Sequence, residues 1–181
     1  MDGQNKSYSS VTVELLLLEV DGVLTDGRAW LDSTGVLRRR FSVRDSIALR
    51  ALRREGVRVV AITKSESPDI DQHLAFVGID ECIQGCTDKA AAVQALLLKF
   101  GLAPSQVASV IKSDEDAWMA TELGCVIAVQ SAGELAKRVA MTVTVCEGGD
   151  GAVREACNTI RSSRMSVDFK NVGQAKAAAG Q

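Results

Sequence analysis

The chain has 181 residues, 46% hydrophobic and 24% charged, a mixture typical of one globular domain and incompatible with global disorder. Lysine and arginine total 21 against 23 acidic residues, so no cationic excess exists to neutralise a nucleic-acid backbone. An apolar run near the start, Leu15 to Leu18, lies between Glu14 and Glu19 and fits neither a signal peptide nor a membrane span. We therefore expect a cytoplasmic protein that binds neither nucleic acid nor membranes.

Short β-branched or aliphatic runs alternate with segments of helical period. This pattern predicts an α/β fold in which helices cover both faces of a parallel sheet. The predicted strands are residues 11–20, 57–62, 81–84, 107–111 and 125–129, with a weaker run at 141–145. Residues 1–10 and 165–181 lack such a period, so we predict frayed ends around a single domain over residues 11–164.

Capping residues predict where the intervening helices begin and end. The expected starts are Asp45, Ser67 with Pro68, Asp88, and Ser113 with Asp116, and the expected stops are Gly56, Gly101 and Gly124. The expected inward residues of the first of these helices are Ile47, Ala48, Ala51 and Leu52, and those of the helix after Asp88 are Ala91, Ala92, Ala95 and Leu96. Ser113 and Asp116 are interpreted chiefly as a capping pair.

One segment, about 28–43, interrupts the alternation as a hairpin around residues 32–35. It follows the first strand, so it projects at the strand ends, where open parallel sheets bind ligands. We expect a lid or an oligomer contact. Trp30 is expected either under the lid or in a subunit interface. The three arginines from Arg38 to Arg40 are interpreted as a solvated strand edge.

The cysteines and His73 are assigned no part in the chemistry of the protein. Five cysteines are odd in number, contain no C-x-x-C pair and are interpreted as buried thiols: Cys82, Cys86, Cys125, Cys146 and Cys157. His73 is interpreted as a surface residue. The glycine-rich run 148–151 before Arg154 is either an anion cradle at a helix N-terminus or a flexible entry to the last helix.

Polar side chains collect after four predicted strands, which would bring them to one crevice. They are Glu19, Asp21, Thr63, Lys64, Ser65, Asp88, Lys89, Lys112, Ser113 and Asp116. The runs 19–27, 41–45, 62–63, 88–89 and 148–155 resemble, in order, motifs of the haloacid dehalogenase superfamily, and within it the phosphatases acting on 3-deoxy-D-manno-octulosonate 8-phosphate. The resemblance implies a Rossmann-like three-layer core.

In that family, an Asp nucleophile precedes a second Asp that acts as general acid and base. By resemblance, Asp21 keeps the acid/base position, Thr63 the hydroxyl, Lys89 the phosphate-neutralising ammonium and Asp116 a downstream carboxylate. The nucleophile position instead holds Glu19. Ile111, Lys112 and Ser113 stand where the family has the Gly-Asp-Asp of its magnesium site, and Lys64 and Ser65 where it has a substrate-contacting Gly-Arg.

These departures predict weak or absent catalysis. Glu19 sets its carboxylate one methylene further out, and Lys112 puts a positive charge where a cation would need oxygen ligands. We expect no cofactor and hypothesise that Lys112 pairs with Glu19. If a metal binds at all, Glu19 and Asp21 are its candidate ligands, with Lys112 and Ser113 at the lost ligand positions.

Two hypotheses follow. The first is a nearly inactive phosphatase homologue that acts in assembly or binds a small anion through Lys64, Lys89, Lys112 and Arg154. The second is an active, Mg²⁺-dependent phosphatase for 3-deoxy-D-manno-octulosonate 8-phosphate or a related nonulosonate phosphate. The chain also resembles the phosphatase-like C-terminal domain of animal N-acylneuraminate cytidylyltransferases. These resemblances imply a homotetramer and a possible cytidylyltransferase or other sugar-acid pathway partner.

Overall fold

A computed structural model describes residues 12–79 and 81–164, so the predicted frayed ends, 1–10 and 165–181, lie outside the described residues. Its main sheet has six parallel strands in the order β5-β4-β1-β6-β7-β8. These strands are β1 (Leu15–Leu18), β4 (Arg58–Ile62), β5 (Glu81–Ile83), β6 (Val107–Ile111), β7 (Cys125–Ala128) and β8 (Thr142–Val143). All six predicted strands are present; β6 has the predicted bounds, and the other five are shorter than predicted, most of all β1 and β8.

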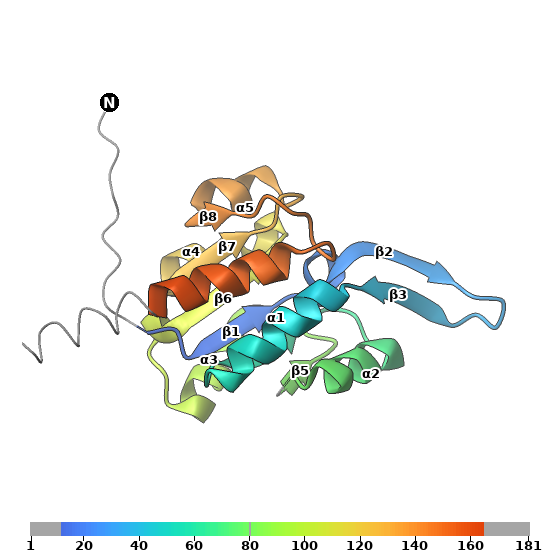
Figure 1. Ribbon diagram of the computed structural model, residues 1–181, viewed down its shortest axis with the longest axis horizontal. Coiled ribbons are helices and arrows are strands. Elements are labelled where there is room, and N and C mark those ends of the chain that lie inside the picture. Colours follow the sequence, from blue (N-terminus) through green and yellow to red (C-terminus); the bar gives the residue numbers. More distant parts are fainter. Residues whose placement is uncertain (1–11, 80, 165–181) are drawn as a thin grey trace, which may run out of the picture.

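Helices connect the strands and cover the sheet. They are α1 (Val43–Arg54), α2 (Pro68–Val77), α3 (Lys89–Phe100), α4 (Met119–Glu122), α5 (Glu134–Val139), the 3₁₀ turns Pro104–Gln106 and Asp114–Asp116, and a helix over residues 152–164. In Figure 1, α1 and the helix of residues 152–164 lie side by side in front of the sheet, and α3 lies behind it. The arrangement is the predicted α/β fold.

The core is centred on β1, whose four leucines are each at most 2% exposed. A strand this apolar fits a position in the middle of a parallel sheet, because both of its faces are covered. In-register pairing with β4 and β6 brings the ends of three strands to one edge, since Leu18 lies opposite both Ala61 and Val110. That edge is where the polar residues follow.

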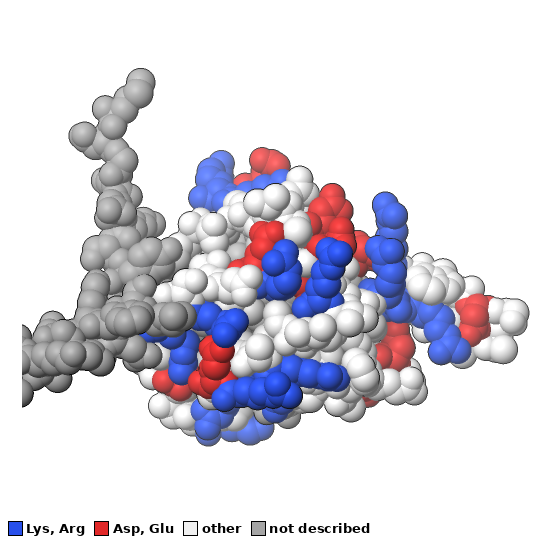
Figure 2. Space-filling model, in the orientation of Figure 1, with Lys and Arg blue, Asp and Glu red and all other residues white. Residues whose placement is uncertain are grey.

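The inserted hairpin consists of β2 (Thr25–Leu31) and β3 (Leu37–Phe41), a separate antiparallel pair. It extends away from the sheet beyond the strand ends (Figure 1). Asp32 stabilises its turn by accepting hydrogen bonds from the amides of Thr34 at 2.9 Å and Val36 at 3.0 Å. On the face that Figure 2 shows, acidic and basic side chains are interspersed, and the hairpin carries both signs.

Two predicted helix faces are confirmed only in part. In α1, Leu52 is buried and Ala48 packs against the core as predicted, but Leu49 is also buried and Ile47 is 62% exposed. In α3, Leu96 is buried and Ala92 packs against the core as predicted, but Ala91 and Ala95 are exposed and Val93 and Leu97 are buried instead. The physical reason in α3 is size: burying a valine and two leucines removes more apolar surface from water than burying alanines.

The predicted caps are partly confirmed. Asp88 caps α3 by accepting a hydrogen bond from the Ala91 amide at 2.9 Å, and Gly101 ends that helix in the left-handed conformation. Ser42, not Asp45, is the N-cap of α1, and its Oγ accepts from the amide of Asp45.

The cysteine prediction holds for two of five. All five are free thiols, but only Cys86 and Cys157 are buried, and Cys82, Cys125 and Cys146 are half-buried. His73 is also half-buried rather than on the surface, because its ring stacks on Phe41 with a centroid distance of 3.7 Å. None of the helices within residues 12–79 and 81–164 is long and apolar enough to cross a membrane.

Candidate functional site

The polar residues that follow β1, β4 and β6 meet at one edge of the sheet. Glu19 and Asp21 follow β1, Thr63 follows β4, Lys112 follows β6, and Lys89 begins α3 after β5. Parallel pairing in register is what places these chain-distant side chains together. These side chains therefore converge at the edge that the sequence predicts.

Lys89 holds the innermost carboxylates. Its Nζ lies 2.6 Å from Asp116 Oδ2 and 3.1 Å from Glu19 Oε1. The three side chains are 9%, 4% and 17% exposed, respectively. Asp116 is thus a buried ionic partner of Lys89 rather than the capping residue that we predicted. Ser113 alone provides the cap, by accepting a hydrogen bond from the Glu115 amide at 3.2 Å.

Burial and ion pairing act in opposite directions on Glu19 and Lys89. Burial raises the pKa of Glu19, and the nearby Asp116 charge adds to the rise, although Lys89 opposes it. Burial lowers the pKa of Lys89, but its two carboxylate partners outweigh this effect and the pKa lies above its usual value. A cavity of about 10 Å³ borders the three groups, room for one water at most. The charges of the cluster are therefore paired with one another.

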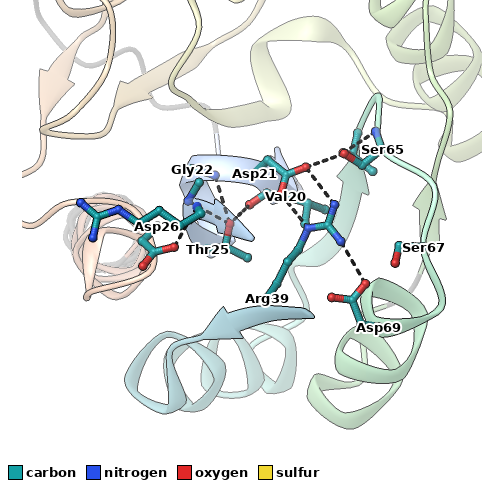
Figure 3. Close-up of polar contacts among 12 residues, drawn as sticks. Val20, Asp21, Gly22, Thr25, Asp26, Arg39, Ser65, Ser67 and Asp69 are labelled. Atoms are coloured by element: carbon teal, nitrogen blue, oxygen red, sulfur yellow. Dashed lines mark hydrogen bonds and ion pairs between the residues drawn. The ribbon is translucent and has the colours of Figure 1, made fainter. Parts of the chain in front are cut away.

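Asp21 is held by two other residues (Figure 3). Arg39 Nε donates to Asp21 Oδ1 at 2.8 Å, and Ser65 Oγ donates to Asp21 Oδ2 at 2.6 Å. Burial raises the pKa of Asp21, but these hydrogen bonds and the charges of Arg39 and Lys112 outweigh it, so the pKa lies below its usual value. A carboxylate that stays ionised in this way is poorly suited to give a proton to a leaving group.

Thr63 stabilises the turn from which Ser65 contacts Asp21. Its side chain is buried, and its Oγ1 accepts a hydrogen bond from the Ser65 amide at 3.2 Å. The hydroxyl therefore shapes the turn that brings Ser65 to Asp21. Thr63 lies where the sequence predicts it, at the end of β4.

Lys112 lies against the turn that carries Asp21, not against Glu19. A Cβ added to Gly22 would lie 2.6 Å from Lys112 Nζ, and one added to Gly27 would lie 2.9 Å from it. Gly22 also has a φ of +85°, so the turn needs glycine both for its backbone and for the passage of this lysine. The predicted Lys112–Glu19 pair is wrong: the partner of Glu19 is Lys89.

The other predicted anion ligands lie at the rim or outside it. Lys64 forms an ion pair with Glu115, and both side chains are more than half exposed. The amide of Arg154 donates at 2.8 Å to Asp45 Oδ1, and Asp45 Oδ2 accepts from the Gly151 amide at 3.2 Å. The helix N-terminus that could have cradled an anion is therefore capped by a buried carboxylate of this chain.

The glycine-rich loop before that helix packs directly on the Asp21 turn. A Cβ on Gly148 would lie 1.8 Å from the carbonyl oxygen of Gly22, and the amide of Gly149 donates to the carbonyl of Val23 at 3.0 Å. Glycine is needed here for the close approach of two backbones. The loop thus fixes the site's shape.

Comparisons with known proteins agree with this geometry. No protein-family model matches the chain. The 3-deoxy-D-manno-octulosonate 8-phosphate phosphatase KdsC of Escherichia coli K12 is 33% identical over 156 residues, which cover 86% of this chain and 83% of that protein. The chain belongs to the KdsC-like phosphatase family of the haloacid dehalogenase superfamily.

Solved KdsC-like structures extend the match to the fold. The Moraxella catarrhalis phosphatase, in complex with magnesium, phosphate and KDO, matches with a TM-score of 0.82 and 31% identity, over 91% of this chain and 94% of that one. The cobalt-bound Haemophilus influenzae phosphatase matches with a TM-score of 0.79 and 27% identity, over 84% and 90%. Members of the family therefore bind divalent metals.

The side chains of this KdsC-like member do not fit such a metal. Within the described part of the chain, no group of three or more His, Cys, Asp or Glu side chains is placed to hold an ion. Glu19 forms an ion pair with Lys89, and Asp21 forms one with Arg39. Lys112 adds a third positive charge beside the turn that carries Asp21. A hard divalent cation needs clustered oxygens, which this edge does not offer.

Sequence reasoning missed two residues at this edge, Arg39 and Asp69. The run of three arginines looked like a solvated strand edge, yet Arg39 is only 4% exposed and bridges Asp21 and Asp69. Strand alternation could have found it, since in a hairpin every second residue faces the same side. Asp69 carried no signal beyond its place in the first turn of a helix.

Proposed function

We propose that this chain is a KdsC-like protein whose phosphatase activity is lost or greatly weakened and that acts as an assembly subunit. The observation that supports this proposal best is the Lys89–Glu19 contact of 3.1 Å, because it neutralises the carboxylate at the nucleophile position. A nucleophile must reach phosphorus in line, and a longer side chain tied to a buried ammonium is badly placed for that.

The charges at the site also argue against a small-anion ligand. Four carboxylates, Glu19, Asp21, Asp69 and Asp116, face three cations, Arg39, Lys89 and Lys112. Each of Arg39 and Lys89 already has two carboxylate partners. A phosphate dianion would have to displace them, so we favour assembly over anion binding.

The hairpin supports the assembly role. It exposes large apolar side chains, with Trp30 54%, Leu31 67% and Val36 44% exposed. Adjacent exposed apolar residues on a projecting element are typical of an interaction site. We propose that they contact a second copy of the chain in a homotetramer, or a cytidylyltransferase of a sugar-acid pathway.

An activity assay tests the loss of catalysis. Purified protein is incubated with a panel of phosphate esters, including 3-deoxy-D-manno-octulosonate 8-phosphate, in the presence of Mg²⁺, Mn²⁺ or Co²⁺. We expect no turnover above that of an Asp21→Asn variant, which controls for contaminating phosphatases. Metal-dependent turnover that Asp21→Asn abolishes would contradict the proposal.

The alternative function is an active phosphatase for a sugar-acid phosphate. It is favoured by the identity to KdsC and by the placement of Asp21, Thr63 and Lys89 at the strand ends in the family's order. The same assay decides between the two. Light scattering tests assembly: Trp30→Asp with Leu31→Asp should lower the particle mass, and Leu98→Asp, an 84% exposed position on α3, should not.

A further inference from the structure

Arg39 differs sharply from its two neighbours on β3. Its side chain is 4% exposed, whereas those of Arg38 and Arg40 are 51% and 66% exposed. Arg38 pairs with Asp32 and Arg40 with Asp26. Alternation along the strand sends the middle arginine of the three toward the protein, into the edge where Asp21 lies.

The guanidinium of Arg39 joins three elements (Figure 3). Its Nε lies 2.8 Å from Asp21 Oδ1 and its Nη2 lies 3.4 Å from Asp21 Oδ2, so it grips the carboxylate that follows β1 with two donors. Its Nη1 lies 3.0 Å from Asp69 Oδ1 in the first turn of α2. Two-donor contacts of a planar guanidinium with a carboxylate are among the strong, geometrically specific hydrogen bonds of proteins.

Asp69 depends on this contact. Its second oxygen, Oδ2, is buried and has no hydrogen-bond partner among the described residues. The Asp69 side chain is 15% exposed, so without Arg39 a largely buried carboxylate would lose its cationic partner. Two residues further along β3, Phe41 stacks on His73 of α2. The same face of the hairpin thus meets α2 through one ionic and one aromatic contact.

We propose that Arg39 acts as a tethered guanidinium ligand of this site, filling the space beside Asp21 and holding the hairpin closed against α2 through Asp69. This inference rests on the proposed loss of catalysis and gives a structural reason for it. A site occupied by a side chain of the protein does not admit a phosphate ester. Asp21 and Asp69 together form a binding site for an alkylguanidinium cation, and the chain supplies that cation itself.

Removal of the tether tests the proposal by chemical rescue. We expect Arg39→Ala to lower the thermal midpoint and to speed amide hydrogen exchange in residues 25–41 and 68–77 by about tenfold or more. Millimolar N-ethylguanidinium should bind the vacated site, raise the midpoint of Arg39→Ala and slow that exchange again. Arg38→Ala and Arg40→Ala are matched controls, and N-ethylguanidinium should raise the midpoint of neither variant nor of the unaltered protein.

Conservative variants separate a ligand role from a structural one. Arg39→Lys keeps the charge but cannot bridge two carboxylates with a planar fork, so it should exchange at a rate between those of the unaltered protein and Arg39→Ala. If Arg39→Ala fails to fold, Asp69→Asn replaces it, because it weakens the α2 contact and leaves Asp21 paired. Faster exchange in residues 25–41 is then the expected result.

Three outcomes would overturn the proposal. The first is equal amide hydrogen exchange in Arg39→Ala and Arg38→Ala, and the second is no rescue of Arg39→Ala by N-ethylguanidinium. The third applies where only Asp69→Asn folds, and is unchanged amide exchange of the hairpin in that variant. These results do not depend on catalysis. Arg39→Ala should also stay inactive, since Glu19 and Lys112 remain. Turnover by the unaltered protein would overturn the proposed function. Turnover that appears only in Arg39→Ala would agree with the role of Arg39 and would mean that Arg39 blocks catalysis in the unaltered protein.

Discussion

The ammonium of Lys89 lies 2.6 Å from the carboxylate of Asp116, and both side chains are less than one-tenth exposed. The ammonium is held by Asp116 on one side and by Glu19 on the other. The Lys89 charge that could attract a ligand is paired with these two carboxylates. The Lys89–Asp116 contact is therefore structural, and its loss should lower the free energy of unfolding measurably.

Replacing Lys89 by Met should destabilise the fold by about 3 kcal/mol at neutral pH, because two buried carboxylates lose their shared cation. Urea denaturation followed by circular dichroism measures this. The matched control is Lys64→Met, which removes an exposed lysine from its pair with Glu115 and should leave the denaturation midpoint unchanged. Equal midpoints for both variants would contradict the ionic cluster.

Acidification should destabilise the protein through His73. Burial and the nearby charge of Arg50 lower the pKa of His73 from 6.5 to about 4. Between these values the unfolded chain binds a proton that the folded protein does not, so the free energy of unfolding falls as the pH drops from 6.5 to 4. The chain has one histidine, so a single NMR resonance reports its titration directly.

His73→Phe is the control for this pH dependence. It keeps an aromatic ring on Phe41 but removes the titrating group, so its stability should change less between pH 6.5 and 4 than that of the unaltered protein. The comparison also cancels the opposite contribution of Glu19, whose raised pKa makes the folded state lose stability as the pH rises from about 4.5. Parallel pH profiles of the two proteins would show that His73 is not responsible.

Asp45→Ala should cost about 2 kcal/mol of stability, because two buried amides at the start of the helix of residues 152–164 lose their acceptor. Asp88→Ala removes a similar cap from α3 at an exposed position and should cost about 1 kcal/mol. Thermal unfolding of both variants gives the comparison. The prediction is wrong if the exposed cap proves the more costly one to lose.

Divalent metals should leave the stability of the unaltered protein unchanged. Only a ligand that binds the folded state raises its thermal midpoint, and the carboxylates at the strand ends are already paired. The triple variant Glu19→Asp, Lys112→Asp and Ser113→Asp restores family residues and should gain about 2.7 kcal/mol when free Mg²⁺ is about 100-fold above its Kd. A midpoint shift of the unaltered protein at sub-millimolar Mg²⁺ would refute this expectation.

The fold and the meeting of Glu19, Thr63 and Lys112 at the strand ends follow from the sequence, whereas the places of Arg39 and Asp69 do not. Apolar runs of strand length, interrupted by helical periods, leave a parallel sheet as the arrangement that buries them, and β1 is the clearest example. Because parallel strands all end at one edge, Glu19, Thr63 and Lys112 had to meet there. These inferences need only local pattern and the rules of strand connection.

The pairing of the charges depends on how elements far apart in the chain pack together. The predicted crevice offered Glu19 three lysines, Lys64, Lys89 and Lys112, and the choice of Lys89 depends on where α3 begins relative to the turns after β4 and β6. Arg39 turns inward because of the register of β3, and a shift of one residue would have exposed it and buried its neighbours. Ion pairs form over a few ångströms between elements far apart in the chain, so no local pattern encodes them.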